Sequence, residues 1–322
     1  MGIDFTVFKG SASEGIVQAT THREAPTGTQ VLVKITHSGI CGTDEHFRHA
    51  DMVLGHEGVG TVQQIGDGVQ GFKVGDVVGW GYIHKACGAC KQCLAGDDNY
   101  CDTPEMFGLS NLDQGSFGSH AIWDASFLFH VPTGVAPEAA APLMCGGATV
   151  FTVLETYGGL GHLAIQFLAK MGAAVVVFSS TDAKRDEALR LGAAEFYLTN
   201  GVEELKIGKG LDHLLVTANS IPDWKPFIRI MNPRGSIYPL TISFTDFSLP
   251  ALPLVTKGLT IQGSTVASRS VLKKMLDFVA FHKIQPIIER FPMTKSGVEE
   301  GMAKLRDGKM RYRGVLVAKD VA

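Results

Sequence analysis

Four cysteines lie close together in the first third of the chain, at Cys87, Cys90, Cys93 and Cys101. Their spacing is C-x2-C-x2-C-x7-C. Four thiolates this near one another suit one tetrahedral structural Zn²⁺, with every coordination position filled by protein. A disulfide pair and an iron–sulfur cluster are the alternatives. Because no signal peptide opens the sequence, the thiols read as metal ligands rather than disulfides, and we favour zinc.

A second group of metal-binding residue types is spread more widely. Cys41 opens Cys41-Gly42-Thr43-Asp44-Glu45-His46, His56 and Glu57 lie in Gly55-His56-Glu57-Gly58, and Cys145 follows much later. Two cysteines and one histidine with an open fourth position form a catalytic zinc set. Glu57 is a candidate fourth ligand. Taken singly, Cys41 would be a small buried side chain and His56 a hydrogen-bonded core histidine. The whole constellation favours catalytic zinc.

Length and composition limit the class of protein. The 322 residues, 45% hydrophobic and 19% charged, fit a globular enzyme-like chain of one large or two ordinary domains. A net charge of −3 argues against nucleic acid as a main partner. No apolar run approaches 18 residues, so the sequence predicts no membrane span. We expect a cytoplasmic protein.

The two halves of the sequence differ in pattern. Short β-branched strands separated by Gly-Asp turns fill the first half, at 30–35, 58–62 and 76–80, and predict an all-β, barrel-like domain. In the second half, strands and helices alternate, which predicts a parallel doubly wound sheet. The expected elements there are helices at 163–172 and 183–191 and strands at 174–178, 214–217, 236–239 and 259–263, with the first of these strands buried.

Five motifs together resemble the zinc-containing medium-chain alcohol dehydrogenases, and within them the cinnamyl alcohol dehydrogenase-like branch. The motifs are Cys41–His46, Gly55–Gly58, the Cys87–Cys101 lobe, Cys145-Gly146-Gly147-Ala148-Thr149-Val150 and Gly158-Gly159-Leu160-Gly161-His162. The resemblance covers nearly the whole chain. It implies an α/β protein of two domains: a GroES-like β-barrel catalytic domain at 1–148 and 285–322 that holds both zincs, and a Rossmann domain at 149–284. It also implies reversible alcohol–aldehyde interconversion and a homodimer.

Two residues near Cys41 are the expected proton carriers. Zn²⁺ would act as a Lewis acid on the aldehyde oxygen as hydride arrives at carbon. Thr43 stands two residues after Cys41, so its hydroxyl can hydrogen-bond that oxygen. His46 matches the family's relay residue, and an imidazole suits proton transfer to solvent. The structural alternatives are a turn residue for Thr43 and a surface histidine for His46.

The sequence after the strand at 174–178 favours NADP(H). An acidic residue at the strand's end would bind the ribose hydroxyls of NAD, but Ser179 stands there. Ser180, Thr181, Lys184 and Arg185 follow, and hydroxyls and cations can hold a 2′-phosphate. The nearby carboxylate of Asp182 argues against NADP(H). Lys184 and Arg185 could also be ordinary solvent-exposed charges on a helix, with no role in cofactor binding. By resemblance alone, further cofactor contacts are expected at Thr149, Gly158, Gly159, Leu160, Gly161, Ser264, Thr265 and Arg313.

One departure from the family pattern concerns the centre of the Rossmann sheet. In the family a strand of pattern x-V-x-V-x-G precedes the glycine motif, but here Tyr157 abuts Gly158, and about a dozen residues are lacking. Either Val150–Leu154 forms a substitute strand, or the central first strand is shortened or missing, or the sequence as given omits a segment of the native protein. We favour the last reading because every other motif is intact.

The sequence therefore predicts a zinc-dependent, NADP(H)-preferring alcohol dehydrogenase that reduces aromatic or medium-chain aldehydes. A polyol or secondary-alcohol dehydrogenase of the same superfamily is the first alternative. A zinc-binding scaffold that has lost its cofactor is the second, and the lacking strand motivates it. Trp80, Phe107, Met106 and Trp123 are either pocket-lining or core residues.

Overall fold

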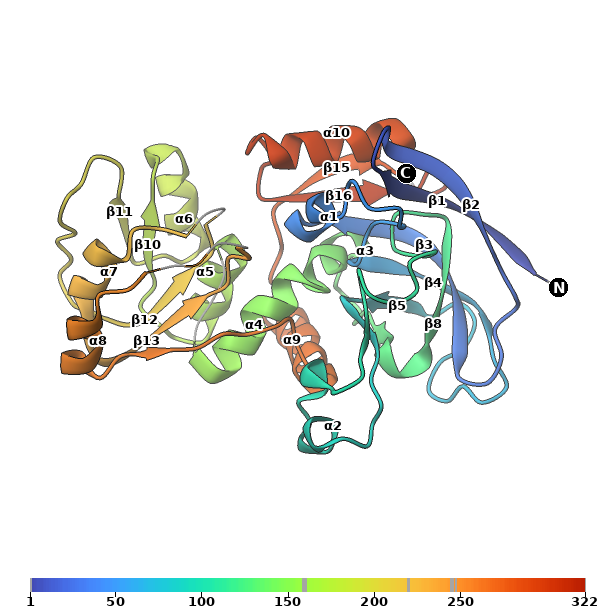
Figure 1. Cartoon of the computed structure of the whole chain (residues 1–322), viewed down its shortest axis with the longest axis horizontal. Helices are drawn as coiled ribbons and strands as arrows, with labels where there is room; N and C mark the ends of the chain where they lie inside the picture. Colours follow the sequence, from blue (N-terminus) through green and yellow to red (C-terminus); the bar gives the residue numbers. More distant parts are fainter. Residues whose placement is uncertain (1, 158–160, 219–220, 244–245, 247, 322) are drawn as a thin grey trace. The chain divides into compact units, whose positions relative to one another are not determined.

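The computed structural model describes residues 2–157, 161–218, 221–243, 246 and 248–321, without the side chains of residues 155–157. The chain forms two compact units, each described by itself below. The first joins Met1–Ala148 to Val266–Ala322, and the second is Thr149–Thr265. Figure 1 shows the blue N-terminal and red C-terminal segments together in the first unit. None of the described helices is both long and apolar enough to cross a membrane.

A seven-stranded sheet organises the first unit. Its strands run in the order β15-β16-β3-β4-β5-β9, with β8 paired to β3. The bounds are β3 Gln30–Ile40, β4 Gly58–Ile65, β5 Val77–Trp80, β8 His120–Asp124, β9 Phe129–His130, β15 Ile288–Pro292 and β16 Arg313–Val317. β3 is long enough to pair with β8 along its first half and with β16 along its last residues. The C-terminal chain thereby completes the sheet that the N-terminal half begins.

Smaller elements close around this sheet. They are the hairpin β1 Ile3–Ser11 and β2 Gly15–Arg23, the pair β6 Ile83–Lys85 and β7 Glu105–Met106, and the helices α1 Gly42–His46, α2 Lys91–Ala95, α3 Pro137–Ala140, α9 Arg269–His282 and α10 Lys295–Arg306. One core cluster joins Phe8 and Ile40 to Val298 of α10 and Leu316 of β16. Burying this apolar surface is the main force that holds the C-terminal segment to the N-terminal strands.

The second unit has the alternating pattern expected from the sequence. Its strands are β10 Val176–Ser179, β11 Glu195–Leu198, β12 Leu211–Val216, β13 Met231–Pro239 and β14 Thr260–Ile261. Its helices are α5 Gly161–Lys170, α6 Arg185–Leu191, α7 Trp224–Ile230 and α8 Ala251–Lys257, and α4 Gly146–Tyr157 enters it from the first unit. All the pairings are parallel, in two sheets of order β10-β11 and β12-β13-β14.

One open alternative and one expectation for this unit were wrong. Val150–Leu154 is not a substitute strand, because it lies inside helix α4. The strand predicted to be buried at 174–178 is β10, and all four of its residues are only half-buried. Apolar sequence alone does not bury a strand; it needs a neighbour on each side and cover on both faces. In the described part of the chain, β10 has a strand neighbour on one side only.

The compact units and the predicted domains differ in where α9 belongs. The Asp98 carboxylate accepts hydrogen bonds from the backbone N–H and Nε of Arg269, at 3.0 and 2.5 Å. Those contacts, with Met275 beside Gly147, place α9 in the first unit, although the sequence assigned residues up to 284 to the Rossmann domain. The domain boundaries at 148 and 284 stay a prediction.

Candidate functional site

The structure brings the second group of predicted metal ligands together. One ligand atom from each of Cys41, His56, Glu57 and Cys145 lies within 4.8 Å of the others. Cys41 follows the end of β3, His56 and Glu57 precede β4, and Cys145 immediately precedes α4. His56 and Glu57 are fully buried. Residues separated by about a hundred positions therefore converge on one buried point.

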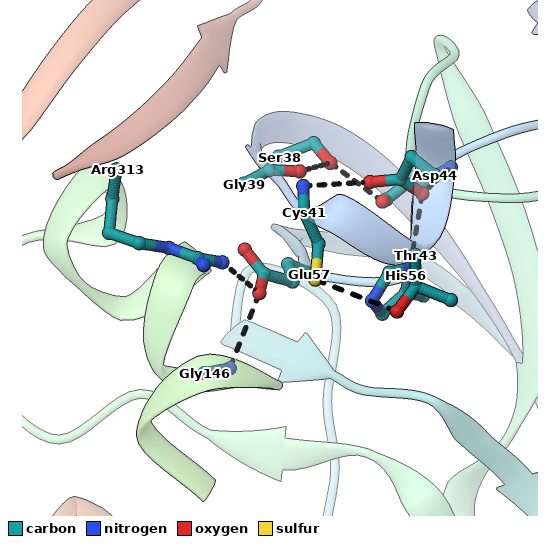
Figure 2. Close-up of polar contacts among 11 residues, drawn as sticks. Ser38, Gly39, Cys41, Thr43, Asp44, His56, Glu57, Gly146 and Arg313 are labelled. Atoms are coloured by element: carbon teal, nitrogen blue, oxygen red, sulfur yellow. Dashed lines mark hydrogen bonds and ion pairs between the residues drawn. The ribbon is translucent and has the colours of Figure 1, made fainter. Parts of the chain in front are cut away.

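Asp44 fixes the orientation of this group. Its carboxylate is fully buried and accepts three hydrogen bonds: from the backbone N–H of Cys41 at 2.9 Å, from that of Gly55 at 3.0 Å and from His56 Nδ1 at 3.0 Å (Figure 2). Burial would lower the pKa of His56, but the charge and hydrogen bond of Asp44 hold it well above its usual value. With Nδ1 bound to a carboxylate, the basic Nε2 is left for a metal.

Asp44 is a functional residue that the sequence analysis missed. The signal was present, since an acidic residue three positions after Cys41 has capping-box spacing. The backbone at Gly55, next to His56, also requires glycine. Its φ is +90°, and an added Cβ would lie 2.5 Å from the Phe117 backbone nitrogen. Only glycine permits this approach, which brings His56 to the site.

Glu57 is held by an ion pair inside the first unit. Its Oε1 accepts from the Arg313 guanidinium and from the Gly146 backbone N–H, the latter at 3.3 Å; Figure 2 shows the carboxylate lying between them. Gly39 makes room for it, because a Cβ there would lie 1.8 Å from Glu57 Oε2. Burial raises the pKa of Glu57 to about 7, against the opposing effect of the Arg313 charge. The Glu57 carboxylate thus lies beside the cysteines with its Oε1 bound to Arg313 and to the Gly146 N–H.

The donor atoms fit a zinc ion. His56 Nε2 and Glu57 Oε2 are buried and have no hydrogen-bond partner among the described residues. Leaving two such atoms unsatisfied is costly unless something binds them. The Cys145 thiol lowers the pKa of Cys41 well below its ordinary value, which favours the thiolate that metals bind. The N-terminus of α4, directly after Cys145, adds a favourable dipole.

The two expected proton carriers share helix α1. Thr43 is half-buried, with Oγ1 3.9 Å from Cys41 Sγ, whereas His46 is exposed. Residues three apart on a helix lie on the same side, so this pair leads from the sulfur cluster toward solvent. His49, also exposed, lies beyond the helix.

The four cysteines of the lobe also gather, and all six cysteines of the chain are free thiols. One sulfur from each of Cys87, Cys90, Cys93 and Cys101 lies within 4.8 Å of the others. Backbone N–H groups point at these sulfurs, as in Cys90 N to Cys87 Sγ and Cys87 N to Cys101 Sγ, both 3.3 Å. Such donors stabilise thiolates, and a Cys₄ set leaves no open position.

The aromatic residues divide between core and site. Trp80 and Trp123 belong to a buried core cluster, with ring centroids 6.2 Å apart. Phe107 packs on the His56 ring at 4.6 Å, and Tyr82, which the sequence analysis did not name, meets it edge-on at 5.6 Å. Burial, together with the thiol charges of Cys145 and Cys41, raises the pKa of Tyr82. Phe107 and Tyr82 therefore pack against the imidazole of the candidate ligand His56.

In the second unit, the residues predicted to select NADP(H) follow β10. Ser179 ends the strand and its Oγ accepts from the Thr181 N–H at 3.2 Å; Ser180, Thr181 and Lys184 are exposed. Arg185 is engaged elsewhere, since its Nε donates to Asp182 at 2.8 Å and its Nη1 to the Phe196 carbonyl at 3.0 Å. The Asp182 charge that spoke against NADP(H) is therefore paired with Arg185.

Other predicted cofactor contacts are dispersed. Thr149 lies on α4, Gly161 begins α5 with φ +37°, and Ser264 and Thr265 follow β14. Ser264 Oγ is buried and has no hydrogen-bond partner among the described residues, so the hydroxyl could donate a hydrogen bond to a ligand. Arg313 belongs to the first unit, where it contacts Glu57. Gly158, Gly159 and Leu160 lie outside the described residues.

Comparison with known proteins places this architecture in a family. Residues 27–133 match the model of the alcohol dehydrogenase GroES-like domain, and residues 159–280 match the zinc-binding dehydrogenase domain. Aldehyde reductase AdhA of Synechocystis is 32% identical over 308 residues, covering 89% of this chain and 90% of its own. NADP-dependent alcohol dehydrogenase C 1 of Mycolicibacterium smegmatis is 30% identical over 334 residues, covering 95% of each chain.

A solved structure agrees with these relatives. A cinnamyl alcohol dehydrogenase from Sorghum bicolor superposes with a TM-score of 0.90 at 29% identity, covering 98% of each chain. The chain belongs to the zinc-containing medium-chain alcohol dehydrogenases. The predicted fold class, a GroES-like unit with a Rossmann unit, is confirmed, although the described strands of the first unit form no closed barrel.

Proposed function

We propose that this protein is an NADP(H)-dependent zinc alcohol dehydrogenase that reduces aromatic or medium-chain aldehydes. The observation that carries the proposal is the Cys41–His56–Cys145 set, half-buried at Cys41 and buried at the other two residues. In it, His56 Nε2 has no hydrogen-bond partner among the described residues, while Asp44 accepts the hydrogen bond of Nδ1. Relatives named as an aldehyde reductase and an NADP-dependent alcohol dehydrogenase support it.

Cys41, His56 and Cys145 would hold the catalytic zinc, with Glu57 as an alternative fourth ligand. When bound there, the ion supplies Lewis acidity toward the aldehyde oxygen. Asp44 keeps the imidazole in its ligand orientation. Thr43 holds the proton destined for the product oxygen, and His46 exchanges that proton with solvent. Arg313 compensates the Glu57 charge beside the two sulfur ligands. The hydrogen bond with Cys41 and burial raise the pKa of Cys145, so this thiol would give up its proton when the ion binds.

The Cys87–Cys90–Cys93–Cys101 group would hold a second, structural zinc, since a Cys₄ set offers no position for substrate. Ser179, Ser180, Thr181 and Lys184 would receive the 2′-phosphate of NADP(H). The engagement of Asp182 by Arg185 supports this choice. We also propose a homodimer and a cytoplasmic location, both of which stay predictions from the sequence.

Two alternatives are less well supported. A polyol or secondary-alcohol dehydrogenase would share the same metal site, and a panel of primary aldehydes, ketones and polyols separates it from an aldehyde reductase. A cofactor-free zinc scaffold would need neither Thr43 nor His46. It predicts zinc without NADPH affinity, which a fluorescence titration with NADPH and NADH measures directly.

The proposal is tested by comparing Cys41→Ser with Cys87→Ser. Both variants should lower bound zinc from two ions to one per chain. Cys41→Ser should lose aldehyde reduction by at least about a hundredfold while keeping its unfolding temperature, because it removes a catalytic ligand. Cys87→Ser should instead lower the unfolding temperature. Unchanged turnover in Cys41→Ser would refute the assignment.

A further inference from the structure

A buried carboxylate in the Cys87–Cys101 lobe is bound to a helix that lies far away in the sequence. Asp98 stands three residues before Cys101, and only 5% of its side chain is exposed. Its backbone carbonyl accepts a hydrogen bond from the Cys101 N–H at 3.2 Å, which joins Asp98 to that candidate zinc ligand. A buried charge needs a partner, and Asp98 has one in Arg269, 171 positions later in the same compact unit.

Arg269 begins helix α9 and is held from two sides. Its backbone N–H donates to Asp98 Oδ1 at 3.0 Å, and its Nε donates to Asp98 Oδ2 at 2.5 Å. The guanidinium also lies over the Phe127 ring, 5.0 Å from the centroid. Ser268, at the N-cap position, gives the helix no side-chain cap hydrogen bond among the described residues. The Asp98 carboxylate therefore caps α9 in its place, where a negative charge also suits the helix dipole.

The chain directly before this anchor carries two of the predicted cofactor contacts. Ser264 and Thr265 end the second unit, and residues 266–268 lead from them to Arg269. Val266 has a φ of +38°, which a side chain branched at Cβ rarely adopts. Such a backbone conformation persists where the surrounding structure fixes it. The two residues after Val266 are buried, so the short link to α9 is held in place up to the anchor.

We propose that Asp98 is a positioning residue for cofactor binding: it fixes the start of α9, and through residues 266–268 it sets the conformation of Ser264 and Thr265. The four-cysteine lobe then has a part in nucleotide binding as well as in stability, because the turn that holds Asp98 ends at one of its metal ligands. Asp98 acts through Arg269 and not on the cofactor itself. The cofactor part of this inference rests on the proposed function, and the anchor does not.

The experiment compares Asp98→Asn with Asp97→Asn. Asp97 is the exposed neighbour, so both variants remove one negative charge from the same part of the lobe. Amide exchange of residues 264–272, followed by mass spectrometry, reports on the start of α9. Fluorescence titration measures NADPH affinity, and metal analysis measures zinc. We expect Asp98→Asn to keep both ions, to speed this exchange at least about tenfold and to weaken NADPH binding at least about tenfold, while Asp97→Asn matches the natural chain.

Two further variants separate the anchor from folding of the lobe. Arg269→Gln breaks the ion pair from the helix side, and we expect the same faster exchange with both ions bound. Combining it with Asp98→Asn should add little, since both changes remove one contact. Cys87→Ser removes the lobe's ion, and it should also speed exchange of residues 264–272.

The outcomes separate this inference from the proposed function. Natural exchange rates in both Asp98→Asn and Arg269→Gln would overturn the anchor. Natural rates in Cys87→Ser would overturn its coupling to the lobe, and faster exchange with unchanged NADPH affinity would overturn its part in cofactor binding. A natural chain that binds neither NADPH nor NADH would refute the proposed function, while the exchange rates would still decide the anchor.

Discussion

At the scale of single residues, Asp44 shows how one carboxylate organises a site that it does not enter. It is fully buried, and its charge is balanced by two backbone N–H groups and His56 Nδ1. These bonds join the loop after β3 to the loop before β4. Losing the carboxylate would therefore disturb both the position and the basicity of the imidazole.

We predict that Asp44→Asn weakens zinc binding at the Cys41–His56–Cys145 site by about 10–100-fold, because a neutral amide holds the imidazole less well. Competition with a chromophoric chelator measures the affinity, and the four-cysteine lobe should keep its ion. Asp186→Asn, at an exposed position of α6, is the matched control. Equal zinc affinity in Asp44→Asn and the control would contradict the positioning role.

At the scale of elements, strand β6 buries a histidine with an unsatisfied nitrogen. His84 stacks on Trp123 with ring centroids 4.0 Å apart, and its Nδ1 has no partner among the described residues. Burial, with smaller effects of the His56 and Arg23 charges, lowers the pKa of His84 to about 3. An unfolded chain would protonate this imidazole near its ordinary value of about 6.5.

The pH dependence of stability follows from that difference. The contribution of His84 is fully present above about pH 6.5 and is lost as the pH falls from there toward about 3, because only the unfolded chain takes up the proton. Between pH 8 and pH 5 the free energy of unfolding should fall by about 2 kcal/mol more in the natural chain than in His84→Phe. Urea unfolding at both pH values measures this. Identical slopes for the two proteins would exclude His84 as the cause.

Much of the fold and most of the site could be predicted from the sequence. Local sequence patterns predicted β3, β4, β5, α5, α6 and four of the second unit's strands, β10, β12, β13 and β14. The cysteine and histidine motifs predicted the two ligand groups that converge. The sequence did not indicate the β1–β2 hairpin, since its strands pair with each other across a short turn and carry few distinctive residues. It also did not reveal Arg313 as the partner of Glu57. That contact joins residues 256 positions apart, and only the tertiary fold creates it.

α4 shows why local pattern can mislead. Val150–Leu154 is β-branched and apolar enough to form a strand, yet it is helical. The helix starts at Gly146, whose N–H donates to Glu57, and it is held there by its tertiary setting. Tertiary contacts override a weak local preference in such a segment.

At the scale of the whole molecule, both candidate metal groups belong to the same compact unit. We predict that a strong chelator lowers the unfolding temperature of the first unit and leaves that of the second unchanged. A shift of about 4–8 °C is expected for a loss of about 2 kcal/mol, because each kcal/mol moves the midpoint of a domain of this size by about 2–4 °C. Scanning calorimetry with and without chelator measures both transitions, and added zinc should restore the first. Equal movement of both would show that metal acts on the molecule as one cooperative block.

The place of β16 between β15 and β3 in the first unit's sheet has a consequence for synthesis on the ribosome. Gly314 pairs with Ile40, the residue next to Cys41, and Arg313 neutralises Glu57. Translation delivers the three candidate zinc ligands early and the inserted second unit next, whereas β16 emerges last. A nascent chain thus carries the thiols of Cys41 and Cys145 and an uncompensated Glu57 carboxylate for roughly 10–30 seconds at elongation rates of about 5–20 residues per second. Closure of the sheet and neutralisation of Glu57 are therefore both late events, and they depend on the same strand.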